Sequence, residues 1–167
     1  MAGIGHTIEA RSTNFLLTIG DDRKLTWASQ NANVAEITLG STIFSSGQKE
    51  LKVPSNTMNQ SPLVTDILLS EDFDEWIVLY KWMLRCKNRN GSHLNETKPI
   101  SLTLLTAQNK PSTTFLYEDA WPTEMSGIQY AVDTDGSTVL TTTAMFEYNR
   151  FIVETANGER IDESYTG

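Results

Sequence analysis

Cysteine, histidine and positive charge are all scarce in this sequence of 167 residues. Its single cysteine, Cys86, excludes a disulfide within the chain. One cysteine and two histidines are too few to build a zinc site from these ligands. The 13 Lys and Arg residues are outnumbered by 21 Asp and Glu residues, which gives a net charge of −8. Because like charges repel, a chain this acidic is not expected to bind nucleic acids or anionic membranes through bulk attraction.

Long apolar runs are also missing. The longest run, Trp76–Tyr80, is far shorter than the roughly 20 residues that a membrane-spanning helix needs. The N-terminus has neither the basic region nor the continuous apolar core of a signal peptide. We therefore expect no membrane anchor, and a chain that is made and kept in a cytoplasm or assembled there into something larger.

Motifs of catalysis and cofactor binding are absent from the sequence. It contains no phosphate loop, no Gly-rich dinucleotide turn and no nucleophile elbow. His6, His93 and Cys86 have no neighbours at a spacing that defines a catalytic triad. Asp133–Ser137 opens like a calcium loop, but Ala144 stands where the bidentate acid is required. We predict that the protein is not an enzyme and has no cofactor or metal.

Apolar residues alternate with Thr and Ser along most of the chain, which is typical of half-buried strands. Gly40–Pro62 is a long excursion in which Glu50–Val53 is predicted as a short edge strand. The last hairpin is expected to turn at Asp133–Gly136. The other predicted strands are Phe15–Ile19 and Lys24–Trp27 as a first hairpin, Val34–Leu39, Val64–Leu69, Ile100–Leu105, Phe115–Tyr117, and Ile128–Val132 and Val139–Phe151 as the last hairpin.

One segment has helical spacing instead. Ser70 is predicted to cap a helix with an acidic first turn, and Gly91 follows as a stop. Leu79 and Trp82 are apolar but lie off the main apolar face, so the helix needs more than one partner surface, which hints at an oligomer. The predicted packing face consists of Phe73, Trp76, Ile77 and Tyr80.

This order of elements predicts a mainly β fold with one α-helix. We expect a small barrel or sandwich of two packed antiparallel sheets, flanked by the helix and the long loop. No repeat or linker divides the sequence, so a single domain is expected over residues 1–167. Its core is placed at about 13–152 and a polar tail at 155–167.

The stretch Tyr117–Tyr130 resembles the tail tube proteins of contractile-tailed bacteriophages. In that family a strand runs into a Trp-Pro-Thr corner, followed by a small residue, an Ile-Gln strand, a short turn and a Thr-rich final strand. Trp121, Pro122 and Gly127 match the corner here, and the resemblance extends over roughly residues 13–152. Because Pro122 has no N–H to donate, we expect it to end a strand, with Trp121 plugging the barrel end.

The resemblance implies a structural virion protein of the phage tail, assembled in the host cytoplasm. Such subunits form hexameric rings whose sheets join into a closed β-barrel, and the rings stack into a tube that conducts DNA without binding it specifically. The implied partners are further copies of the chain, the sheath protein, and the baseplate and tail-terminator proteins. Ring stacking is assigned to Ser41, Phe44, Pro54, Asn56 and Met58. Candidate acids facing the channel are Asp133, Asp135 and Glu147.

Three alternatives to the repeating tube subunit stay open. Ala156–Gly167 extends past the usual aromatic finish of the family, so the chain is also compatible with an initiator, a terminator or a baseplate protein of the same fold. A tube subunit of a type VI-like secretion system is a second alternative. The third is a monomeric β-sandwich binding module that uses Trp27 and its loops.

Overall fold

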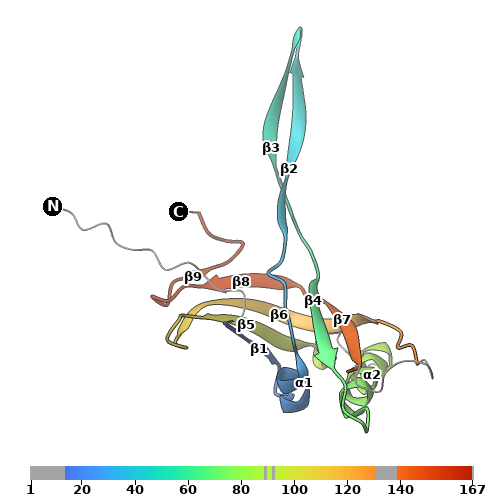
Figure 1. Ribbon diagram of the computed structural model, residues 1–167. Coiled ribbons are helices and arrows are strands. Elements are labelled where there is room, and N and C mark those ends of the chain that lie inside the picture. Colours follow the sequence, from blue (N-terminus) through green and yellow to red (C-terminus); the bar gives the residue numbers. More distant parts are fainter. Residues whose placement is uncertain (1–13, 89, 92, 131–138, 167) are drawn as a thin grey trace, which may run out of the picture.

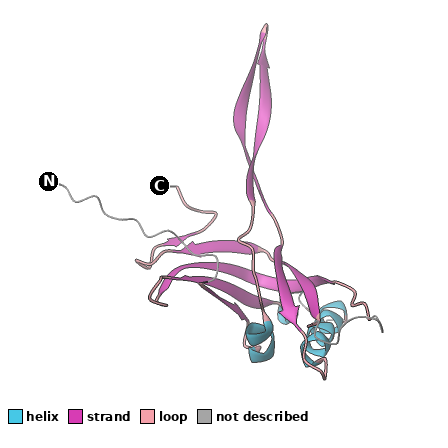
Figure 2. Cartoon of the chain, in the orientation of Figure 1, coloured by secondary structure: helices cyan, strands magenta, loops and turns pink. Residues whose placement is uncertain are grey.

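The computed structural model describes residues 14–88, 90–91, 93–130 and 139–166. Figures 1 and 2 show a curled antiparallel sheet with helices at one end and a long hairpin standing out from it. The mainly β fold class is therefore confirmed. The strands of the sheet are β1 (Phe15–Ile19), β4 (Leu63–Leu68), β5 (Lys98–Leu105), β6 (Pro111–Met125), β7 (Thr141–Glu147), β8 (Arg150–Glu154) and β9 (Arg160–Ile161).

Strand β6 is shared by two groups of strands. Its first half pairs with β5 on one side and β8 on the other, and its last residues pair with β7. The sheet therefore runs β1-β5-β6-β7-β4, with β8 and β9 beside the first half of β6. Inward-facing residues alternate along β4 and β7, and the core between the sheet and the helices is built from side chains such as Leu63, Ile67 and Phe146.

Pro122 does not end a strand, contrary to the prediction. It lies inside β6, is buried, and pairs with Phe146 of β7. The position tolerates proline because β6 exchanges partners here, and a register shift follows at once between Pro122 and Glu124. Trp121 is half-buried within the same strand, and Gly127 follows after the strand has ended.

The prediction of an N-terminal hairpin is correct for its first strand only. Strand β1 has its predicted bounds, but the next segment is a short helix, α1 (Arg23–Ala28), and not a strand. Leu25 is the buried residue of this helix, and the Thr26 hydroxyl accepts a hydrogen bond from the Ile19 backbone N–H at 3.0 Å. That bond occupies an edge N–H of β1, and the apolar anchor at Leu25 stabilises the single helical turn against the sheet.

Helix α2 (Asp74–Lys87) begins four residues after its predicted cap and buries a different face. Leu79 and Trp82 are its buried residues, whereas Ile77 and Tyr80 of the predicted face are 38% and 44% exposed. Trp82 packs on Phe146 with ring centroids 5.7 Å apart, and its indole N–H donates to the Glu96 carbonyl at 2.7 Å. The face with Trp82 is buried, and not the face with Ile77 and Tyr80, because the indole N–H of Trp82 finds a hydrogen-bond acceptor there.

Two further differences concern the ends of the helix and of the chain. Ser70 is not the helix cap: its N–H and hydroxyl both donate to the Glu75 carboxylate, while Phe73 occupies the cap with φ of 56°.

The C-terminal tail contributes strand β9, and Arg160 donates to the Glu118 carboxylate at 2.9 Å. Val139–Phe151 forms two strands instead of one, Ile128–Tyr130 is not a strand, and Asp133–Gly136 lies outside the described residues. Between the helix and β5 is a short 3-10 helix, η1 (His93–Glu96).

None of the helices in the described part of the chain is long and apolar enough to cross a membrane.

The buried face of α2 yields a direct test. Replacing Leu79 by Ala should lower the free energy of unfolding by about 2–5 kcal/mol, because it leaves a cavity in the core. The matched change Ile77→Ala, on the predicted but exposed face, should cost less than about 1 kcal/mol. Urea denaturation of both variants measures the difference. If both variants lost the same free energy of unfolding, the face predicted from the sequence would be buried as well.

Candidate assembly surfaces

The hairpin formed by β2 (Ile37–Ser46) and β3 (Lys49–Gln60) projects away from the sheet (Figure 1). Among the described residues, its two strands pack on each other and make no comparable contact with another helix or strand. A two-stranded hairpin is at best marginally stable in water on its own. The projecting hairpin is therefore a candidate surface for contact with a partner.

The outer half of the projecting hairpin has one apolar face. Phe44 pairs with Leu51, and Val53 pairs with Thr42 two residues away, so these side chains project on the same side of the ribbon. Phe44 is 62% exposed and Leu51 56%. The opposite face carries Ile43 across from Lys52. We call Phe44, Leu51 and Val53 the apolar face of the hairpin.

The stacking residues predicted from the sequence all lie on this hairpin. Phe44 belongs to the apolar face, and Met58 is exposed nearer the root, paired with Leu39. Ser41 pairs with Pro54 just beyond a register shift, and Asn56 is exposed on β3. Leu51 and Val53 were placed by the sequence in an edge strand but not in the stacking set. Their pairing with β2 depends on the register, which the sequence leaves open.

Two tyrosines hold the root of the hairpin. The Tyr117 hydroxyl of β6 donates to the Asn33 carbonyl and accepts from the Ala35 N–H, both at 3.3 Å. The Tyr148 hydroxyl donates to the Ser61 carbonyl at 2.7 Å. Asn33 and Ala35 lie just before β2, and Ser61 lies just after β3, so the two hydroxyls hold the incoming and the outgoing chain.

Burial keeps both phenols neutral. It raises the pKa of Tyr117 well above its ordinary value, and raises that of Tyr148 to about 12. The rings meet edge to face, with centroids 4.9 Å apart and an angle of 71° between planes. Phe151 packs against both rings. Both tyrosines belong to stretches that the sequence singled out, but their contacts join residues too far apart in the chain to be read from it.

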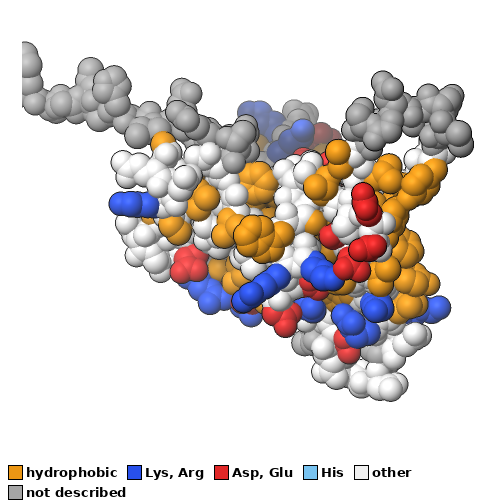
Figure 3. All heavy atoms as spheres, turned by 60° about the horizontal axis from the view of Figure 1, so that its bottom comes forward, with side chains coloured by type: hydrophobic (Ala, Val, Ile, Leu, Met, Phe, Trp, Pro, Cys, Tyr) orange, Lys and Arg blue, Asp and Glu red, His pale blue; other side chains and the backbone are white. Residues whose placement is uncertain are grey.

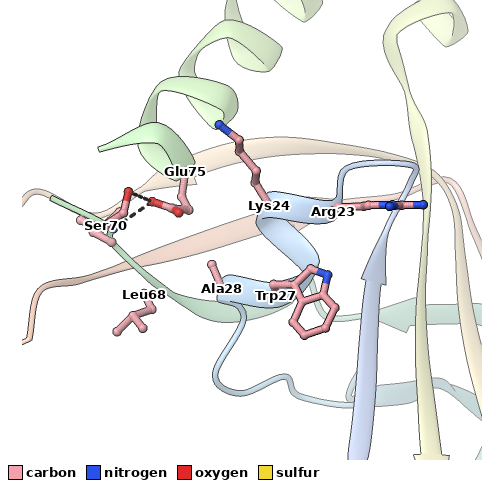
Figure 4. A pocket seen from close by; sticks show the side chains of 8 residues that line it. Arg23, Lys24, Trp27, Ala28, Leu68, Ser70 and Glu75 are labelled. Carbon is pink, nitrogen blue, oxygen red and sulfur yellow. Dashed lines mark hydrogen bonds between the residues drawn. The ribbon is translucent and has the colours of Figure 1, made fainter. Parts of the chain in front are cut away.

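A second surface lies at the helical end, away from the hairpin (Figures 1 and 4). It is an open groove of about 440 Å³ between α1 and the end of β4. Trp27 is 86% exposed at its border, and Figure 4 shows Ala28 between Trp27 and Leu68. Arg23, Lys24 and Glu75 supply charge around these apolar groups. Trp27 is the residue that the sequence associated with a binding module.

Charges of both signs surround the apolar groups at this end. Figure 3 shows hydrophobic side chains among Lys, Arg, Asp and Glu side chains on the face that carries the helices. Lys24 of α1 forms an ion pair with Asp74 at the start of α2, and Lys98 lies over the Trp82 ring, 5.3 Å from its centroid. These contacts join α1, α2 and β5.

The remaining candidate residues do not form a site. Glu147 is half-buried at the end of β7, opposite Trp121, whereas Asp133 and Asp135 lie outside the described residues. His6 also lies outside them, and Cys86 faces the Glu96 carbonyl at 3.8 Å. Within the described residues, no three His, Cys, Asp or Glu side chains are grouped so that they could hold a metal ion.

Comparison with known proteins gives the class of this fold. No protein-family model matches the chain. It is similar to the tail tube terminator protein of Enterobacteria phage T4, with 24% identity over 157 residues, covering 87% of this chain and 89% of that protein.

Solved structures share the fold. The tube terminating cap of the anti-feeding prophage superposes with a TM-score of 0.70 and 15% identity, over 93% of this chain and 100% of that one. The sheath/tube terminator of the PVC extracellular contractile injection system gives 0.71 and 13%, over 90% and 99%. A crystal structure of an Hcp protein gives 0.53 and 14%, over 89% and 98%.

The fold and these matches define a class of structural tube proteins. The chain has the tube fold found in contractile tails and injection systems, and the resemblance predicted from the sequence is confirmed. The matched proteins named here are a tail tube terminator and a tube terminating cap.

The two phenols at the hairpin root predict a response to alkali. Unfolded tyrosines ionise near pH 10, whereas Tyr148 stays neutral in the fold to about pH 12. Unfolding therefore releases protons in this window, and the free energy of unfolding should fall as the pH rises from 10 to 12. In Tyr148→Phe the fall should be less steep. Urea titrations at several pH values measure it, and an unchanged slope would contradict the burial of this phenol.

Proposed function

We propose that this protein is a tail tube terminator, a structural virion protein whose ring closes the end of the inner tube of a contractile phage tail. The observation that carries the proposal is the similarity to the phage T4 terminator over almost the whole of both chains. The likeness to two terminator or cap structures, with TM-scores of 0.70 and 0.71, is in keeping with it.

The repeating tube subunit remains a second candidate. A chain from the PVC sheath-tube complex shares the fold with a TM-score of 0.67, and one from the anti-feeding prophage baseplate with 0.66. Both candidates form hexameric rings, assembled in the host cytoplasm, with sheath and baseplate proteins as neighbours in the tail. They differ in whether rings of this chain stack on one another without limit.

The terminal strands of the sheet differ in whether their edges are open to another copy of the chain. The N–H groups of Val64 and Asp66 on the outer edge of β4 donate to the side chains of Asn33 and Asn31 at 2.6 and 2.7 Å. That edge is therefore occupied. We assign the contacts between neighbouring subunits to the two other terminal strands, β1 and the short β9, which lie at opposite edges of the strands paired with the first half of β6. The net charge of −8 suits a channel that DNA crosses without adhering.

We assign the contact with the next ring to the projecting hairpin. Substitutions on its apolar face test this assignment. The double change Phe44→Ser with Leu51→Ser should abolish attachment to the tube, because a seryl side chain recovers little of the buried apolar area. Stability should change by less than about 0.5 kcal/mol, since the hairpin stands apart from the core. Negative-stain electron microscopy of mixtures with tail tubes shows the attachment.

Ile43→Ser is the matched control for this experiment. Ile43 is 57% exposed on the same strand but lies on the opposite face of the ribbon. It should reduce attachment much less than the double variant. If both changes act equally, the apolar face is not the contact surface.

The terminator and the repeating subunit give different images. Purified protein, taken through a concentration series, should show rings with six-fold end views and no long tubes, and added to growing tubes it should stop their elongation. Long hollow tubes of this chain alone would instead establish the repeating subunit. A monomer that neither forms rings nor binds tubes would contradict both candidates.

A further inference from the structure

We propose that Tyr117 and Tyr148 are positioning residues that fix the direction in which the projecting hairpin leaves the sheet. The inference rests on the proposed function only where it claims that this direction matters for attachment to the tube. The geometry itself concerns a single copy of the chain, and can be tested there.

The root of the hairpin is held on two sides. On one side, the segment before β2 lies along β4, where the Asn33 side chain accepts from the Val64 N–H, and the segment after β3 continues directly into β4. On the other side, the hydroxyls of Tyr117 and Tyr148 reach the same two segments from β6 and from the β7–β8 connection. A ribbon attached along one strand alone can pivot about it, and a second attachment removes this freedom.

Two further bonds at the root do not replace the tyrosines. The Ser61 N–H donates to the Glu36 carbonyl at 2.9 Å, and the Glu36 N–H donates to the Ser61 hydroxyl at 2.8 Å. Both bonds join the two arms of the hairpin to each other. These bonds hold the two strands of the hairpin together, but they do not fix the angle between the hairpin and the sheet.

The length of the hairpin amplifies any change at its root. Strand β3 has 12 residues, which at roughly 3.3 Å each makes an arm of about 40 Å. A pivot of about 10° at the root would therefore move the tip by about 7 Å. A displacement of this size exceeds the tolerance of a packed apolar contact, because such contacts are lost within an ångström or so.

The tyrosine rings allow the hydroxyls to be removed alone. Tyr117 is fully buried, and its ring packs on Tyr148 and on Phe151 at 5.3 Å. Phenylalanine at both positions keeps these ring contacts and deletes only the bonds to the hairpin root. Tyr80→Phe is the control, because Tyr80 is on α2 and stacks on Trp76, 5.2 Å away.

The experiment measures the angle of the hairpin in the unassembled protein. Spin labels at Glu50→Cys near the tip and Lys110→Cys in the β5–β6 turn, in a Cys86→Ser background, report the tip-to-sheet distance by pulsed electron resonance. We expect Y117F/Y148F to widen the distance distribution about twofold and to reduce attachment to tubes at least tenfold. Y80F should change neither.

A distribution as narrow as that of the unmodified protein would overturn the inference, whatever happens to attachment. A widened distribution with full attachment would support the positioning role but count against the hairpin as the tube contact. Should the double variant fail to fold, Y148F alone carries the test, because Tyr148 is only half-buried. For that variant too, an unchanged width overturns the proposal.

Discussion

Strand β6 is the constraint on which the rest of the molecule depends. It pairs with β5 and β8 along its first half and with β7 along its last residues, so both groups of strands share one backbone. The change of partner explains the buried Pro122, which a continuous ladder would not accept. It also presents Tyr117 beneath the root of the hairpin. One strand thus sets the curl of the sheet and the place where the projecting hairpin leaves it.

The two ends of the molecule solve different physical problems. At the helical end, Leu79 and Trp82 are buried against the sheet, and Lys24 of α1 is paired with Asp74 of α2, while Trp27 stays exposed beside the groove. The hairpin end leaves Phe44 and Leu51 in solvent. An exposed apolar patch of this kind is typical of a surface that binds a partner.

Much of the fold could be predicted from local pattern, and most errors involved contacts distant in sequence. Alternation identified β1, β4 and β5, because each has one buried face. The wrong face of α2 was chosen because its apolar surface is wide, and the deciding partners, Glu96 and Phe146, lie outside the helix. Lys24–Trp27 has a strand-like pattern but forms helix α1, because Leu25 is buried against the sheet. The residues predicted for stacking all lie on the hairpin of β2 and β3, and their stacking role stays a prediction; the apolar face of the hairpin depends on a strand register that the sequence does not fix.

The asparagines beside β4 bear on aggregation of the folded chain. Exposed strand edges are templates for unwanted pairing between chains. Asn31 and Asn33 occupy the edge N–H groups of Asp66 and Val64 with side chains of the same chain. These bonds protect this edge against pairing with the sheet of another copy of the chain. Resistance to aggregation at this edge is thus encoded in two amide side chains.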